Sequence, residues 1–102
     1  MKNFDIITAD MICASGIRNG ELEDDLTVPN EHEVEICRLF LACCRVYPCG
    51  TPRHSYGLKH RIERQAGKYV SNGALILAGV QMNIPQKCHR WYNTKLYIRV
   101  PR

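Results

Sequence analysis

Long apolar runs are missing from this sequence of 102 residues. The longest uninterrupted apolar stretch, from Ala74 to Val80, has seven residues, whereas a membrane-spanning helix needs about 20. The first residues include Asp5 and carry no long apolar core, so we expect no secretory signal. These absences predict a cytoplasmic protein that makes no contact with a membrane.

Catalytic motifs are also missing. The sequence contains no Walker loop, no H-E-x-x-H and no G-x-S-x-G. Ser55 and His60 could form part of a nucleophilic site, but the only acid after residue 50 is Glu63. Lys59 lies one helical turn before Glu63 and can pair with it, which leaves no acid to orient a triad. We therefore predict that the protein is not an enzyme and needs no cofactor.

The six cysteines lack the paired C-x-x-C spacing of structural zinc sites. Without a secretory signal, they are not expected to form a disulfide framework either. Cys37 and Cys44 are seven residues apart, so on a helix they share a face and behave as small buried hydrophobic residues. Zinc remains the alternative, although adjacent Cys43 and Cys44 would point about 100° apart on a helix; we predict no metal. The candidate zinc ligands are Cys43, Cys44, Cys49, His54, His60, Cys88 and His89.

Charge is distributed unevenly along the chain. Residues 1–50 contain four bases and nine acids, for a net charge of −5, whereas residues 51–102 contain ten bases and one acid, for +9. Such asymmetry is typical of an interaction surface. The alternative is that the two halves fold against each other, in which case each surface ion pair contributes only about 0–1 kcal/mol.

Length and composition predict one folded domain spanning residues 1–102, since 45% of the residues are hydrophobic and 24% are charged. Cap, turn and proline signals then divide the chain into elements. The predicted elements are a strand over residues 4–6, a helix over 9–15, an acidic loop over 17–29, a helix from Asn30 to near Tyr47, a helix over 56–66 capped by Ser55 and stopped by Gly67, and a core helix over 73–82.

The last segment, residues 95–100, alternates strictly between apolar and polar side chains, which is typical of a strand. Leu96, Ile98 and Val100 fall on one side of it. A single strand needs a partner, and we consider residues 4–7 or the edge of another chain. The predicted fold is therefore α+β: a compact, mostly helical domain of three to four helices with a short terminal strand or small sheet.

Basic residues form two candidate binding surfaces. In the helix over residues 56–66, Leu58, Ile62, Ala66 and Tyr69 share a predicted core face, and a basic stripe lies opposite. In the terminal strand, a tyrosine between two cations suits stacking on a base. The first surface comprises Arg53, His54, His60, Arg61, Arg64 and Lys68, the stripe being His60, Arg64 and Lys68, and the second comprises Lys95, Tyr97 and Arg99.

The sequence also offers a candidate helix-turn-helix and a candidate acidic surface. The helices over residues 56–66 and 73–82 could form a helix-turn-helix, but the second offers only Asn72, Gln81 and Asn83, at its ends, to contact base edges. We therefore predict at most weak, non-specific and salt-sensitive binding of nucleic acid. An acidic surface could instead mimic phosphates toward a basic partner, and it comprises Glu21, Glu23, Asp24 and Asp25.

One stretch carries a resemblance. It runs Ser55-Tyr56-Gly57-Leu58-Lys59-His60, then Glu63, then Tyr69-Val70-Ser71-Asn72-Gly73-Ala74 with Ile76 and Ala78. This stretch resembles small uncharacterised proteins of bacteriophages, prophages and plasmids of proteobacteria. The resemblance implies a mobile-element origin, and small proteins of such elements include non-catalytic inhibitors of host defence, among them anti-CRISPR proteins.

The function expected from these observations is stoichiometric binding. The favoured partner is a host protein or ribonucleoprotein complex that handles nucleic acid, blocked in the manner of an anti-CRISPR protein. The alternative is a nucleic-acid-binding regulator of the mobile element itself. The sequence leaves the oligomeric state open, as well as the choice between the basic and the acidic surface.

Overall fold

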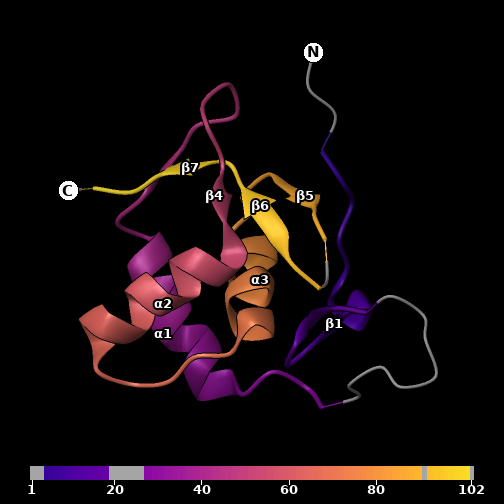
Figure 1. Ribbon diagram of the computed structural model, residues 1–102, viewed down its shortest axis with the longest axis vertical. Coiled ribbons are helices and arrows are strands. Elements are labelled where there is room, and N and C mark those ends of the chain that lie inside the picture. Colours follow the sequence, from indigo (N-terminus) through magenta and orange to yellow (C-terminus); the bar gives the residue numbers. More distant parts are fainter. Residues whose placement is uncertain (1–3, 19–26, 91, 102) are drawn as a thin grey trace.

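The helix α3 (Asn72–Gln81) stands in the middle of the fold (Figure 1). The structure is a computed structural model that describes residues 4–18, 27–90 and 92–101. The side chain of Ser71 caps α3 by accepting a hydrogen bond from the Ala74 amide at 3.1 Å. Seven of the ten residues of α3 are buried. The prediction that this apolar segment belongs in the core is confirmed.

The helix α1 (Glu31–Leu41) begins as predicted, because the Asn30 side chain accepts hydrogen bonds from the amides of His32 and Glu33. It ends earlier than predicted. The residues assigned to its last turns instead form the strand β3 (Arg45–Val46), since they pair with the C-terminal strand. Cys37 is buried on α1, but Cys44 lies beyond the helix, so the expectation that the two share a helix face is wrong.

The helix α2 (Ser55–Ala66) is capped by His54 rather than by Ser55. Nδ1 of His54 accepts from the Tyr56 amide at 3.3 Å, whereas the buried Ser55 hydroxyl accepts from the Thr94 amide at 3.0 Å. Gly67 ends the helix with a φ of 70°, as predicted.

The predicted core face of α2 is only half correct. Leu58 and Ile62 are buried, but Ala66 and Tyr69 are exposed. The last turn of α2 extends away from the central helix α3 (Figure 1), so Ala66 lies beside the groove described below. Tyr69 follows Gly67, whose left-handed conformation ends the helix before the chain reaches it.

Short antiparallel strands complete the fold. The strands are β1 (Ile12–Cys13), β2 (Gly16–Ile17), β3 (Arg45–Val46), β4 (Arg53–His54), β5 (Gln86–Cys88), β6 (Thr94–Leu96) and β7 (Ile98–Arg99). They form one three-stranded sheet in the order β4-β6-β5 and two pairs, β1-β2 and β3-β7. The fold class is therefore α+β, as predicted, with the C-terminal segment supplying strands to two of the sheets.

The predicted terminal strand is interrupted at Tyr97, where the chain passes from β6 to β7. Its amide donates to the Pro85 carbonyl at 3.0 Å, and its carbonyl accepts from the Tyr47 amide at 2.8 Å. The predicted partner, residues 4–7, does not pair with this segment. It lies along β5 instead, where the Asp5 amide donates to the Gln86 carbonyl at 3.0 Å.

The N-terminal segment differs from the prediction of a helix over residues 9–15. It contains only a 3-10 turn, Ala9–Met11, followed by the β1-β2 hairpin. The hairpin turns at Ala14 and Ser15, and Gly16, the first residue of β2, has a φ of 131°, a conformation that favours glycine. Ile17 of the predicted acidic loop belongs to β2, and most of the rest of that loop lies outside the described residues.

Gly73 is the point where α3 approaches the hairpin most closely. A Cβ atom there would lie 1.8 Å from the Cys13 carbonyl oxygen, which is backbone and cannot move alone. We predict that Gly73→Ala lowers the free energy of unfolding by about 2 kcal/mol, the typical cost of overpacking. The measurement is urea denaturation followed by circular dichroism.

Gly57 provides the matched control, because a Cβ atom there meets nothing within 4 Å. Since Gly57 lies inside α2, Gly57→Ala should raise the stability by about 0.5–1 kcal/mol. Equal denaturation midpoints for the two variants would contradict the close packing of α3 on the hairpin.

Candidate functional site

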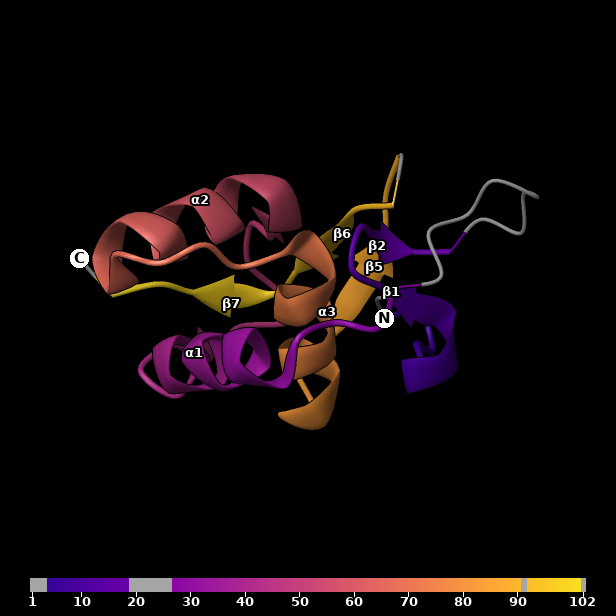
Figure 2. The ribbon, with the colours of Figure 1, turned by 90° about the horizontal axis from the view of Figure 1, so that it is seen from below.

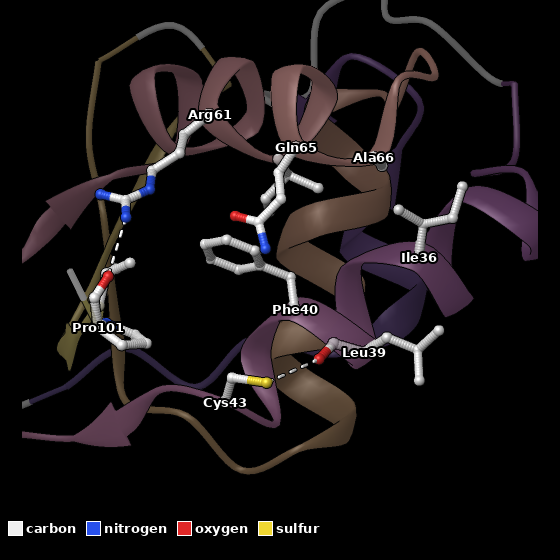
Figure 3. A pocket seen from close by; sticks show the side chains of 10 residues that line it. Ile36, Leu39, Phe40, Cys43, Arg61, Gln65, Ala66 and Pro101 are labelled. Carbon is white, nitrogen blue, oxygen red and sulfur yellow. Dashed lines mark hydrogen bonds between the residues drawn. The ribbon is translucent and has the colours of Figure 1, made fainter.

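A groove runs between α1 and α2 and ends at the C-terminal segment (Figure 3). Its volume is about 450 Å³. In Figure 3, the Phe40 ring lies between the two helices, and Gln65 extends from α2 toward it. The lining residues are Ile36, Leu39, Phe40 and Cys43 near α1, Arg61, Ile62, Gln65 and Ala66 on α2, and Val100 and Pro101 at the C-terminal end.

The lining of the groove is mainly apolar. Leu39, on its α1 side, is 64% exposed, and Phe40 and Ile36 are half-buried. These three side chains lie on a different side of α1 from its buried residues Val34, Cys37 and Leu41, and α1 packs beside α3 (Figure 2). A contiguous apolar surface of this kind marks an interaction site more often than scattered apolar residues do.

Arginines border the C-terminal end of the groove. Arg61 donates a hydrogen bond to the Pro101 carbonyl at 2.9 Å, as the dashed line in Figure 3 shows. Arg45 and Arg99 lie directly opposite each other in the β3-β7 pair. They line a second hollow, of about 530 Å³, which shares Val100 and Pro101 with the groove.

A fourth arginine and a tyrosine extend this border. Arg53 and Arg99 line a third hollow, of about 300 Å³, together with Tyr47. The Arg99 guanidinium lies 4.3 Å from the centre of the Tyr47 ring, a distance typical of a cation–π contact. We call Arg45, Arg53, Arg61 and Arg99 the arginine rim.

The arginine rim has no acidic partner within the described part of the chain. The carboxylates of Glu31 and Glu35 pair with Arg38 on α1, and Glu63 pairs with Lys59 and His60 on α2. Like charges placed directly opposite on two strands, as in Arg45 and Arg99, destabilise a sheet. The rim therefore carries positive charge that an acidic ligand can neutralise.

Three of the predicted basic residues, Arg53, Arg61 and Arg99, belong to the arginine rim. Arg45 was missed because it lies in the acidic half of the sequence, and only its pairing with β7 brings it to the others. The groove itself was missed as well. The sequence predicts that Leu39 and Phe40 belong to a helix buried on two sides. Nothing in the local sequence shows which apolar face of that helix a neighbouring element leaves exposed.

The prediction that Tyr97 is exposed for stacking is wrong. Tyr97 is only 6% exposed, and its ring packs edge-on against Phe4 at 4.9 Å between ring centres. The break between β6 and β7 ends the strict alternation, so Tyr97 and Ile98 are both buried. Tyr97 therefore supports the N-terminal segment and does not contribute a binding surface.

The other predicted residues are distributed elsewhere. His54 and Lys95 face each other across β4 and β6, and Nδ1 of His60 lies 3.0 Å from the Glu63 carboxylate. Arg64 and Lys68 are exposed on or just after α2 and do not line the groove. The acidic surface of Glu21, Glu23, Asp24 and Asp25 lies outside the described residues.

The candidate zinc ligands are not gathered in one place. Among residues 4–18, 27–90 and 92–101, no three histidine, cysteine or acidic side chains come together as a metal site. The rings of His54 and His89 do meet edge-on, with 5.0 Å between their centres. In the same part of the chain, no helix has the length and apolar character required to span a bilayer.

Comparisons with protein-family models, with curated proteins and with solved structures gave no match to this chain. The groove and its arginine rim are therefore interpreted from their own chemistry.

Cysteine reactivity provides a test of the groove geometry. Burial raises the pKa of the Cys37 thiol to about 12, with smaller contributions from nearby carboxylates, whereas Cys43 is exposed at the groove. Because the thiolate is the reactive form, we predict that iodoacetamide at pH 8 modifies Cys43 and leaves Cys37 unmodified in the folded protein. Mass spectrometry of peptides over time measures both rates.

Denaturation provides the control for this experiment, because both thiols should react at similar rates in urea once the burial of Cys37 is lost. Equal rates in the folded protein would contradict the placement of Cys37 in the core and of Cys43 at the groove.

Proposed function

We propose that the protein acts by stoichiometric binding, and that the groove with its arginine rim is its surface for an acidic protein partner. The observation that carries the proposal is the combination of an apolar groove with four arginines that lack acidic partners in the described residues. Arginine and tyrosine are enriched at the centres of protein interfaces, where apolar contacts are surrounded by polar ones.

The chemistry of the site favours a particular kind of partner. Apolar side chains of the partner would fill the groove between Leu39 and Phe40 on one side and Ile62 on the other. Its carboxylates would meet the arginine rim, where arginine can bind a carboxylate with two parallel hydrogen bonds. An amphipathic segment with acidic residues at one end has this pattern, and a helix lying in a groove is a common mode of recognition.

The resemblance to proteins of mobile elements adds a biological context to the proposal. We propose that the partner belongs to a host complex that handles nucleic acid, and that the protein blocks it without catalysis, as an anti-CRISPR protein does. The second candidate function, a nucleic-acid-binding regulator of the mobile element, is favoured by one separate observation. His54 and Lys95 are basic residues that lie directly opposite each other on neighbouring strands of the three-stranded sheet.

Reversal of one charge in the arginine rim tests the proposal. Arg99→Glu places a carboxylate opposite Arg45, so it should preserve or raise the stability of the fold. Charge reversal in a complementary interface costs several kcal/mol, so we predict that partner binding falls at least about tenfold. The measurement is quantitative capture from host lysate with tagged protein, followed by titration of the captured protein to determine its stoichiometry.

The matched control is Arg64→Glu, which reverses an exposed charge on α2 outside the groove. It should capture the same partner as the unmodified protein. Equal capture by Arg99→Glu and the unmodified protein would exclude the arginine rim as the binding surface. Capture that disappears on nuclease treatment would favour the regulator.

A further inference from the structure

The open face of the three-stranded sheet carries a row of three bases. Lys87, Lys95 and His54 are directly opposite one another on β5, β6 and β4. Neighbouring strands are about 4.8 Å apart, and the like charges of Lys87 and Lys95 at such positions destabilise a sheet. Gln86 and Leu96, the preceding and following residues, are buried on the other face, so the row points to solvent. We call these three residues the basic row.

Further basic side chains lie beside the basic row. The His89 ring packs edge-on against that of His54. Desolvation lowers the pKa of His89, and the charges of Lys95, His54 and Arg90 lower it further. The nearest acid on an adjacent segment, Asp5, accepts a hydrogen bond from the Cys88 amide at 2.6 Å and makes no ion pair with the row in the described residues.

A pocket lined by tyrosines adjoins the basic row. Its volume is about 430 Å³, and Tyr56, Tyr69 and Tyr92 line it together with Lys59 and Asn93. Tyr56 is 52% exposed and Tyr69 is 64% exposed, so both rings are accessible to a ligand. We call this hollow the tyrosine pocket.

Two hydrogen bonds connect the pocket to His54 of the basic row and to its neighbour His89. Nδ1 of His54 accepts from the Tyr56 amide at 3.3 Å, and the His89 amide donates to the Asn93 carbonyl at 2.8 Å. Residues of the row and its neighbours are therefore in direct contact with residues that line the pocket.

The pocket is held in a defined shape. Tyr92 has a φ of 65°, a left-handed conformation that is unfavourable for a residue with a side chain. Its carbonyl is fixed by the Ile17 amide at 2.9 Å and by the Asn72 side-chain amide at 3.2 Å. Strained backbone of this kind is concentrated at ligand-binding and functional sites.

Lys59 places a cation between two of the rings. It is only 6% exposed, and its Nζ atom lies 4.6 Å from the centre of the Tyr69 ring and 5.9 Å from that of Tyr56. Nζ donates to Glu63 and to the Val70 carbonyl, both at 3.1 Å. An ammonium group has three N–H donors, so one remains for a ligand in the pocket that Lys59 lines.

We propose that the basic row and the tyrosine pocket together bind single-stranded nucleic acid. The row contacts the phosphates, and an unpaired base enters the pocket, where it stacks on a tyrosine ring and accepts a hydrogen bond from Lys59. Proteins that bind single strands without sequence preference combine a cationic track with aromatic stacking in this way. Double-stranded nucleic acid lacks an unpaired base, and the buried helix α3 cannot enter a major groove.

This surface is separate from the groove and the arginine rim, so the inference does not rest on the proposed binding of an acidic protein; it deepens the second candidate function, the nucleic-acid-binding regulator, which rests on the same basic row. The test uses a fluorescein-labelled oligothymidylate of about 12 nucleotides, close to the site size of single-strand-binding domains. Fluorescence anisotropy gives its affinity over a series of salt concentrations. We expect a duplex of the same length to bind at least about tenfold more weakly, because its paired bases cannot stack on the tyrosine rings.

Two variants separate the parts of the surface. Tyr69→Ala should weaken binding by about 5- to 150-fold, the value of one stacked base. Lys87→Ala combined with Lys95→Ala should make the fall of log K with the logarithm of the salt concentration shallower by about 1.4, because two phosphate contacts are lost. Both variants change residues outside the hydrophobic core, and thermal unfolding verifies that they fold.

The matched controls carry the same substitutions elsewhere. Tyr47→Ala removes another exposed tyrosine, and Arg64→Ala combined with Lys68→Ala removes two other exposed cations; both should leave the affinity unchanged. The proposal is overturned if Tyr69→Ala binds like the unmodified protein, or if duplex and single strand bind equally. It is also overturned if Arg99→Glu abolishes oligonucleotide binding, because the nucleic acid would then lie on the arginine rim.

Discussion

Burial of α3 is the constraint on which the rest of the structure depends. Seven of its ten residues are buried, and a helix that is apolar nearly all round must be covered by neighbouring elements on most of its sides. Leu75 and Ile76 are completely buried, and each such side chain contributes about 1.5–3 kcal/mol relative to exposure. Gly73 and Gly79 permit close approach on two sides, to the β1-β2 hairpin and to the three-stranded sheet.

The groove is a consequence of this arrangement. Since α1 and α2 both bury apolar residues in the core that contains α3, other sides of the two helices are left to line the groove, with Ile36, Leu39 and Phe40 on α1 and Arg61, Gln65 and Ala66 on α2. These faces meet around Phe40 and Ile62, where the C-terminal residues Val100 and Pro101 cover only one end. A small domain with one central helix has too few elements to cover both faces of its outer helices.

Ion pairs within the described residues are found on the helices and not on the strands. On the helices, acids and bases one turn apart pair within the same helix, as Glu35 does with Arg38 and Glu63 with Lys59. On the strands, cross-strand neighbours have the same sign, as in the pairs Arg45–Arg99 and Lys87–Lys95. Uncompensated positive charge therefore accumulates on the strands, at the rim of the groove and on the open face of the sheet.

The sequence by itself determined the central helix, the caps of α1 and α3, the end of α2 at Gly67, and the excess of bases after residue 50. These features depend on neighbours within one or two turns, such as Ser71 capping α3 and Gly67 ending α2. Tertiary structure alone decided which apolar face stays open, that β3 replaces the end of α1, and that Tyr97 is buried. Arg45 joins the arginine rim, and Lys87 the basic row, only through pairing with strands distant in the sequence. Such pairing depends on long-range packing, which no local pattern of residues encodes.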